Sequence, residues 1–281
     1  MDRETITKKL TELFGELSGN TLTKENRIDR RFIGTVMFDE PIVGFGPADD
    51  PLFDEYKKVG VIGPWHMSPN EWLEGAGTVI SLFFPISEEV RRSNYGEKHV
   101  GSKQWAYARI DGQTYIGSYM AALKSWLEAQ GVRCCVPALD ERFAAVQGGK
   151  GMSGDGIDEN TYSSRWSERH AAYVCGLGTF ALSKGLITRR GIAGRFASII
   201  CDLPLEPDAR PYTGIYDYCI NCNACVKRCP VNAIDPVTGK DHKICHGNVI
   251  KSGIIHYPRY GCGLCQTKVP CEKGIPSLIK G

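Results

Sequence analysis

The sequence predicts an α+β protein of two domains, with residues 1–208 forming a mixed helix and strand domain and residues 209–281 a small cysteine-rich domain. Three observations support this prediction. The chain of 281 residues is 42% hydrophobic, which is enough to bury one substantial core. Eight of its 12 cysteines fall within the last 63 residues. Just before them runs PLEPDARP, whose prolines predict a stiff linker between the two domains.

Hydrophobic patterns predict the elements of the first domain in order. At the N-terminus, apolar residues four or three apart predict an amphipathic helix. Residues 35–47 are expected to be extended, and the β-branched and aromatic content of GAGTVISLFFP predicts a buried strand. A helix is expected over residues 115–129, with Gly131 ending it. Further strands are expected at VRCCVPA and RFASIICDL, and between them a helix over 165–175 that Ser163 or Ser164 would cap.

Charge and hydropathy give no indication of several classes of partner. Lys and Arg total 34 against 32 for Asp and Glu, so a formal charge of +2 gives no strong signal for nucleic acid or an anionic membrane. No segment approaches the roughly 18 apolar residues that a membrane span needs, and no export signal is recognisable. We therefore expect a cytoplasmic protein. Because intracellular reductants keep thiols reduced, its cysteines predict metal binding rather than disulfides.

The run CINCNACVKRCP has the C-x2-C-x2-C-x3-C-P spacing of bacterial ferredoxins, which hold 4Fe-4S clusters. In modules with two clusters, the fourth cysteine of such a run binds the other cluster. We therefore expect two 4Fe-4S clusters with crossed ligation. The first cysteine group comprises Cys219, Cys222, Cys225 and Cys271, and the second cysteine group comprises Cys229, Cys245, Cys262 and Cys265.

Two spacings depart from the ferredoxin pattern. Sixteen residues separate Cys245 from Cys262, and the last step, CQTKVPC, is longer than usual and places Pro270 before Cys271. Cys271 is therefore the ligand whose assignment depends most on the crossed scheme. An alternative is a zinc ribbon built from the C-x2-C pairs that begin at Cys219 and Cys262. That alternative leaves four nearby cysteines without a role.

From Trp65 to its end, the chain resembles the epoxyqueuosine reductases, corrinoid iron–sulfur enzymes related to the reductive dehalogenases. The resemblance rests on HMSPNEWLEGAGTVISLFF, YARIDGQTYIGSYMAALKSWLEAQG, WSERHAAYVCGLGTFALSKGLIT, GIAGRFASIICDLPLEPDARPY and the cysteine-rich domain. It implies that the first domain is a nitroreductase-like α/β sandwich that holds cobalamin, and that the second is a ferredoxin-like domain with two clusters. It further implies a reductase in which the clusters reduce the cobalt and a side chain supplies a proton.

The resemblance also implies site residues. The proton-donating position of the family falls on Tyr162 when counted from Glu168 without gaps, with Asp158 and Glu159 as neighbours that could serve instead. A partly exposed tyrosine near a helix start is the plainer interpretation. Residues in two matching stretches are expected to contact the corrinoid: Tyr107, Arg109, Gly176, Gly178, Thr179 and Ser183. The second of these stretches, GLGTFALS, lacks the tryptophan and lysine that the family has there.

Other functions remain open at this point. GLGTFA also fits a G-x-G-x-x-A nucleotide fingerprint, although a helix rather than a strand is expected before it. The chain could instead be an electron-transfer protein that serves a separate corrinoid protein, or a reductase that holds flavin. We expect a low-potential donor such as ferredoxin or flavodoxin, and a small-molecule or modified-nucleoside substrate. Nucleic acid is a possible partner that the charge does not indicate.

Overall fold

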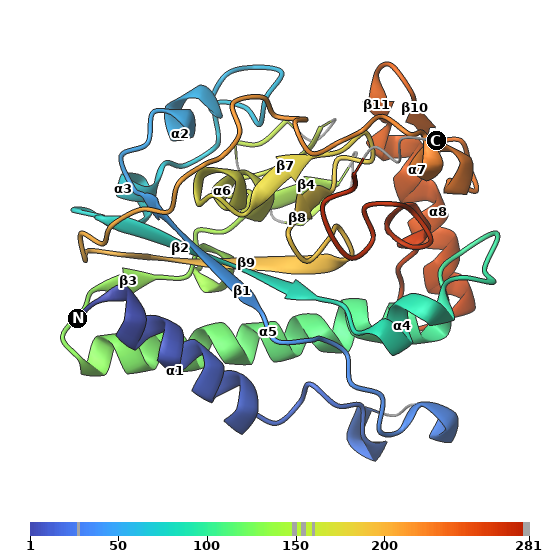
Figure 1. Cartoon of the computed structure of the whole chain (residues 1–281), viewed down its shortest axis with the longest axis horizontal. Helices are drawn as coiled ribbons and strands as arrows, with labels where there is room; N and C mark the ends of the chain where they lie inside the picture. The colour runs from blue at the N-terminus through green and yellow to red at the C-terminus, as the bar shows by residue number, and fades with distance from the viewer. Residues whose placement is uncertain (27–28, 148–150, 153–155, 159–160, 278–281) are drawn as a thin grey trace.

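A computed structural model describes residues 1–26, 29–147, 151–152, 156–158 and 161–277. Its centre is an antiparallel sheet in the order β1 (Ile42–Pro47), β2 (Thr78–Pro85), β9 (Gly194–Cys201) and β3 (Cys134–Cys135). The register pairs Ile80 with Phe45 on one side and with Ile199 on the other. All eight residues of β2 are buried because helices and loops cover both faces of the sheet (Figure 1).

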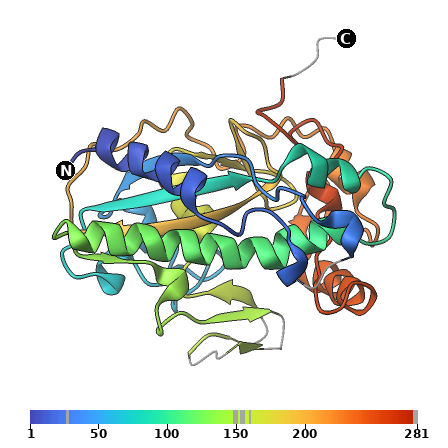
Figure 2. The ribbon, with the colours of Figure 1, turned by 90° about the horizontal axis from the view of Figure 1, so that it is seen from below.

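Two long helices cover one face of this sheet (Figure 2). They are α1 (Arg3–Glu16), which Asp2 caps, and α5 (Lys103–Ala129), which Ser102 caps. The opposite face carries α6 (Glu168–Val174), together with the hairpin of β7 (Gly178–Phe180) and β8 (Leu186–Thr188) (Figure 1). Shorter elements complete this domain: α2 (Leu52–Glu55), α3 (Pro69–Trp72), α4 (Glu88–Ser93), and the small sheet of β4 (Ala145–Gln147), β5 (Gly151–Met152) and β6 (Tyr162–Ser164).

Most expected elements are present, and two differ in extent for physical reasons. Helix α5 begins twelve residues before the expected start at Tyr115. The glycine that interrupts the helical pattern, Gly112, provides room for the Phe38 ring, because a Cβ there would lie 2.6 Å from it. Helix α6 begins later than expected, because Ser163 and Ser164 belong to strand β6. The mixed α and β architecture is as predicted, and the nitroreductase-like topology remains a prediction.

The cysteine-rich domain packs against one end of the sheet, beside α4 and the start of α5 (Figure 1). It contains α7 (Ala224–Arg228), the hairpin of β10 (Ile234–Asp235) and β11 (Gly239–Lys240), α8 (His242–Ile255) and a 3-10 turn at Leu264–Gln266. Three further 3-10 turns lie in the first domain at Lys24–Asn26, Arg30–Phe32 and Pro137–Leu139. No helix among the described residues is long and apolar enough to cross a bilayer.

Close backbone contacts dock the cysteine-rich domain. The Trp105 ring lies against Gly263, where a Cβ would come within 1.9 Å of the indole. A Cβ on Gly101 would likewise lie 2.2 Å from the Cys262 carbonyl oxygen, which accepts a hydrogen bond from Asn94 at 3.0 Å. The Arg259 guanidinium pairs with Asp111 on α5 at 2.9 Å. These contacts position the cysteines relative to the first domain.

Candidate metal centres and the site beside them

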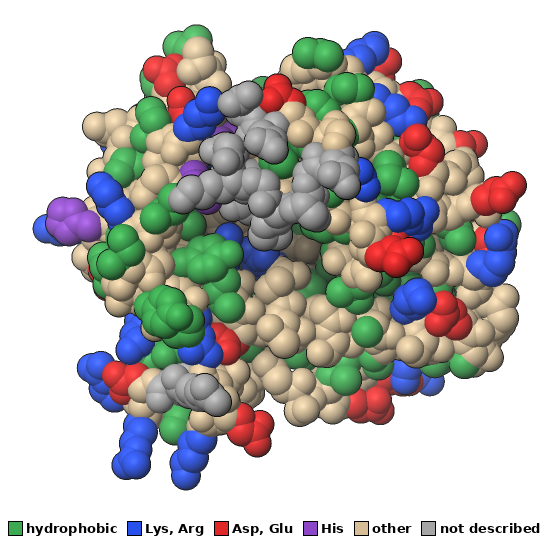
Figure 3. Space-filling view, turned by 180° about the vertical axis from the view of Figure 1, so that it is seen from behind, with side chains coloured by type: hydrophobic (Ala, Val, Ile, Leu, Met, Phe, Trp, Pro, Cys, Tyr) green, Lys and Arg blue, Asp and Glu red, His purple; other side chains and the backbone are tan. Residues whose placement is uncertain are grey.

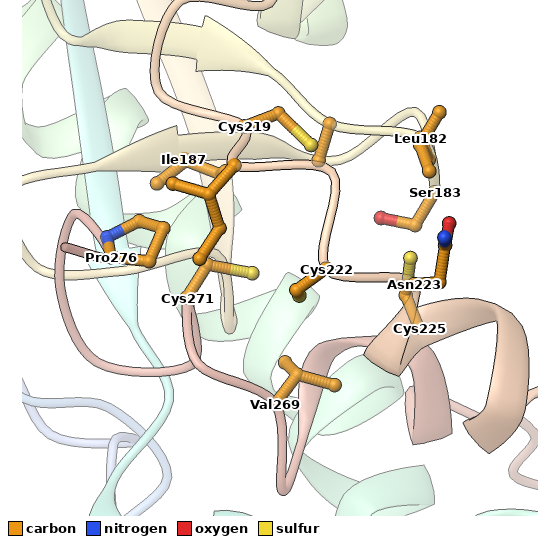
Figure 4. A pocket seen from close by; sticks show the side chains of 12 residues that line it. Leu182, Ser183, Ile187, Cys219, Cys222, Asn223, Cys225, Val269, Cys271 and Pro276 are labelled. Carbon is orange, nitrogen blue, oxygen red and sulfur yellow. The ribbon is translucent and has the colours of Figure 1, made fainter. Parts of the chain in front are cut away.

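The first cysteine group surrounds one cavity (Figure 4). Cys219 and Cys222 reach it from a tight loop, and Cys225 reaches it from the first turn of α7, which follows that loop. The backbone of this loop turns sharply because Asn221 and Asn223 adopt left-handed conformations, with φ of 50° and 58°. The sequence separates Cys271 from these three by more than 40 residues, yet Cys271 lines the same cavity.

Cys271 is held there by the turn between β8 and β9. The Ile192 amide donates to the Cys271 carbonyl oxygen at 2.9 Å. The next residue, Glu272, packs so closely that a Cβ on Gly191 would lie 2.1 Å from its carbonyl oxygen. Burial raises the pKa of the Cys271 thiol to about 12, and the thiols of the other three members raise it further. The grouping is the one expected for the first cluster, and the ligation itself remains a prediction.

The second cysteine group gathers around α7, α8 and the turn that follows Gly263. Burial raises the pKa of Cys262 to about 12, with smaller contributions from the thiols of Cys265 and Cys245. Burial also raises the pKa of Cys245, and Cys265 and Cys229 add to this increase. Two of these sulfurs accept hydrogen bonds from the protein: Ala233 N donates to Cys229 Sγ at 3.2 Å, and Asn248 Nδ2 to Cys262 Sγ at 3.5 Å.

The thiols of the first cysteine group are spread around a space rather than gathered at one point. One zinc ion needs its sulfur ligands at about 2.3 Å. Among the residues that the structure describes, no three His, Cys, Asp or Glu side chains are grouped closely enough to hold one ion. The first cysteine group instead encloses a space with apolar walls. Buried thiols resist deprotonation, so a bound cationic centre would be needed to stabilise their thiolates.

The candidate acid Tyr162 lies on β6 and contacts the cysteine-rich domain. Its ring stacks on His242 with centroids 4.5 Å apart and planes 8° apart, and it meets His246 edge-on at 6.3 Å. Both histidines belong to α8, which also carries Cys245. Tyr162 is 43% exposed, so its hydroxyl can reach a ligand. Sequence analysis did not predict this contact.

The other two candidate acids lie before β6. The Asp158 carbonyl oxygen accepts hydrogen bonds from the Thr161 amide and hydroxyl at 3.0 and 2.6 Å, which form the turn that leads into the strand. Asp158 precedes Tyr162 by four residues, and its side chain is exposed. Glu159 lies outside the described residues. Both assignments remain predictions.

Three arginines make the region beside Tyr162 electropositive. The side chain of Arg169 is exposed, and desolvation by the surrounding protein lowers its pKa. Burial lowers the pKa of Arg195 to about 9, and the charges of Arg109 and Arg169 lower it further. Figure 3 shows a hollowed face with basic side chains within it. The thiol of Cys265 also influences the Arg169 charge, so the second cysteine group is near this hollow.

Sequence analysis also missed Glu168, which was used there only to count back to the position of the expected proton donor. Its Oε2 accepts a hydrogen bond from Ser198 at 2.7 Å, whereas its Oε1 is buried and has no hydrogen-bond partner within the described ranges. Burial raises the pKa of this carboxyl to about 7. A protonated carboxyl beside Arg169 would be an acid at neutral pH. The sequence signal was a charged triplet, Glu168 to His170, opening a short helix that is otherwise apolar.

The residues expected to contact the corrinoid have different environments. Tyr107 is 3% exposed and packs against Phe32, with the Arg259 guanidinium over its ring, so it is a packing residue. Arg109 stacks on Tyr260 at 4.1 Å and contributes to the electropositive region. Ser183 lines the cavity of the first cysteine group instead.

The remaining three residues, Gly176, Gly178 and Thr179, take part in close backbone packing and a backbone hydrogen bond. Gly176 has φ of +75°, and a Cβ would lie 2.8 Å from the Ala209 carbonyl oxygen. A Cβ on Gly178 would lie 1.9 Å from the Ile187 carbonyl oxygen across the hairpin. Thr179 is fully buried and accepts the Tyr218 amide at 2.9 Å. These placements give the two glycines and Thr179 a structural role. They also place a strand directly after Leu177, which does not match the strand-then-helix context of a nucleotide fingerprint.

Comparisons with known proteins agree with this arrangement. Residues 212–235 match the family model of the 4Fe-4S binding domain. Two curated epoxyqueuosine reductases match parts of the chain. The one from Listeria monocytogenes is 31% identical over 85 residues, or 27% of this chain and 21% of the relative. The one from Leadbetterella byssophila is 32% identical over 109 residues, or 35% of each. The matched region thus spans about a fifth to a third of these relatives.

Solved structures share the fold over nearly the whole chain. A structure of epoxyqueuosine reductase with an epoxyqueuosine-modified tRNA stem loop covers 97% of this chain and 68% of its own, with a TM-score of 0.52 and 16% identity. A reductive dehalogenase structure interpreted for B12-dependent dehalogenation covers 84% of this chain and 30% of its own, with a TM-score of 0.50 and 18% identity. These comparisons confirm the resemblance predicted from the sequence.

Proposed function

We propose that this chain, which shares the fold of the epoxyqueuosine reductases, is a cytoplasmic oxidoreductase in which two 4Fe-4S clusters deliver electrons to a corrinoid. Its substrate would be a small molecule or a modified nucleoside. One observation carries the proposal: the predicted acid, Tyr162, contacts the helix that carries Cys245, so the proton donor and the second cysteine group adjoin the same hollow. A free-standing ferredoxin has no use for such an acid.

The burial of the cysteines gives the electron path a direction. Cys222, in the first cysteine group, is exposed, whereas no member of the second group is. The charge of Arg169 in the hollow responds to Cys265, which belongs to the second group. Electrons would therefore enter from a low-potential donor such as ferredoxin or flavodoxin near Cys222. They would leave through the second group.

The residues around the hollow define what the protein would contribute. Arg169, Arg195 and Arg109 would attract electron-rich or anionic groups of the cofactor and substrate and hold them in place. Tyr162 would donate a proton to the reduced substrate from its ring position on His242. A corrinoid bound there would supply a low-valent cobalt that passes electrons to the substrate.

The cofactor content of the purified protein tests this proposal. We expect anaerobic expression with cobalamin supplied to give a brown protein with eight irons and one corrinoid per chain. Flavin in place of the corrinoid would support a flavin reductase instead. Clusters without either cofactor would overturn the proposal in favour of an electron-transfer protein, and zinc without iron would overturn the clusters.

Substitution of Tyr162 tests its proposed role. Tyr162→Phe should keep iron and corrinoid content and slow the reduction of an epoxyqueuosine-modified stem loop by about 100-fold or more, the usual contribution of a positioned acid. Tyr216 has a similar exposure, 48%, and lies away from α8 in sequence, so Tyr216→Phe is the matched control. Equal rates for the two variants would remove Tyr162 from the mechanism.

A further inference from the structure

The wall of the first cysteine cavity contains a buried hydroxyl that has no partner. Ser183 is 1% exposed, and its Oγ makes no hydrogen bond within the part of the chain that the structure describes. Figure 4 shows this hydroxyl directed into the space between the cysteines, beside Asn223 and Cys225. A buried hydroxyl without a partner is costly, so its presence at this position requires an explanation.

The surrounding structure gives the hydroxyl few alternatives. Ser183 lies in a tight turn in which the Lys184 amide donates to the Ala181 carbonyl oxygen at 2.7 Å, and the Ala181 amide to the Gly185 carbonyl oxygen at 2.9 Å. These bonds fix the backbone that carries it. The neighbouring wall is apolar, with Ala181, Ile187 and Val269 packed in one buried set. Of the described side chains that line the cavity, the thiols and the amide of Asn223 are the only other polar ones.

We propose that the Ser183 hydroxyl donates a hydrogen bond to a sulfur of the cluster held by the first cysteine group and thereby raises its reduction potential. Reduction adds an electron, so the cluster becomes more negative and its sulfurs become better acceptors. A fixed donor therefore stabilises the reduced state more than the oxidised state. The inference rests on the proposed clusters, because the hydroxyl needs their sulfurs as its partner.

The second cysteine group contains a counterpart that serves as a matched comparison. Asn248 is 5% exposed, and its Nδ2 donates to Cys262 Sγ at 3.5 Å. Each group would thus have one buried side-chain donor from outside its cysteine set. Because Ser183 and Asn248 adjoin different groups, their substitutions should affect different clusters.

An anaerobic redox titration followed by EPR separates the two effects. Ser183→Ala should lower one cluster potential by roughly 59 mV, which corresponds to a tenfold change in the equilibrium constant for a one-electron reduction. Asn248→Ala should move the other potential, and Ser183→Thr should restore the first. Val269→Ala is the control, because it removes an apolar part of the same wall and leaves the hydroxyl in place. Water that enters the space left by the valine should not lower the potential of the first cluster.

A second measurement does not depend on the potentials. In deuterated buffer, pulsed EPR of the reduced protein should detect an exchangeable proton coupled to the first cluster, and Ser183→Ala should lack it. Unchanged potentials together with an unchanged proton signal, at full iron content, would overturn the role of Ser183. A protein that binds no iron would instead overturn the proposed clusters themselves.

Discussion

The ion pair between Arg91 and Glu272 allows a quantitative test of how the cysteine-rich domain is held. Glu272 follows Cys271 directly, and its Oε1 lies 3.2 Å from Arg91 Nε and accepts the Tyr95 hydroxyl at 2.8 Å. The two ionic side chains are only 9% and 8% exposed. The other carboxylate oxygen of Glu272, Oε2, accepts a hydrogen bond from the Lys268 amide. One carboxylate therefore connects α4 to the chain around Cys271, the last predicted ligand.

Glu272→Gln should destabilise the protein by about 3 kcal/mol. Removing one partner of a buried pair leaves the other charge buried, which costs roughly 3–5 kcal/mol. The lower end of this range applies because Arg91 keeps two other partners. Its guanidinium donates a hydrogen bond to the Ile86 carbonyl oxygen at 2.6 Å and lies 3.9 Å from the Asp39 carboxylate. For a chain of this size, the apparent unfolding temperature should fall by roughly 6 °C.

Anaerobic thermal unfolding, with iron content measured on the same samples, provides the assay. Because Glu272 positions Cys271, we also expect Glu272→Gln to lose iron from the first cysteine group more readily. Glu128→Gln breaks an exposed pair with Lys124 and should cost less than about 0.5 kcal/mol, so it is the control. A Glu272→Gln protein as stable as Glu128→Gln would refute the buried-pair argument.

Three further changes test other parts of the structure. Because the folded protein raises the pKa of Glu168 from 4.5 to about 7, its stability should fall as pH rises through this range, by up to about 3 kcal/mol. Glu168→Gln should remove this dependence in urea unfolding at pH 5 and 8, and an unchanged slope would contradict the assignment. Gly263→Ala should undock the domain and lower iron content, because its Cβ would overlap Trp105, whereas Gly117→Ala on α5 should not. Cys271→Ser should lose one cluster of two, measured as iron per chain, and full iron content would exclude it as a ligand.

Local patterns were sufficient for the framework of the fold and for the membership of the cysteine-rich domain. The run at β2 is strongly apolar and β-branched, so its burial could be predicted without knowing its partners. The spacing of Cys219, Cys222 and Cys225 brings three thiols together within one loop and the helical turn after it, because a short chain segment leaves few other arrangements.

Features that depend on distant segments could not be predicted in this way. Tyr107 matched a family stretch, but its side chain packs under Arg259, which lies about 150 residues further along the chain. The elevated pKa of Glu168 arises from burial against Ser198 on another strand, and neither residue alone indicates it. The contact between Tyr162 and His242 likewise forms only because two domains dock.

The sequence by itself thus determined the long helices, the strands of the central sheet and the grouping of Cys219, Cys222 and Cys225, because spacing and hydrophobic period act over a few residues. Tertiary structure alone decided that Ser183 supplies the buried hydroxyl of the first cysteine cavity, and that α8 lies beside Tyr162. Those juxtapositions depend on β-sheet register, the hairpin of β7 and β8, and domain docking. Each of these joins segments far apart in the chain, and no local pattern records the pairing.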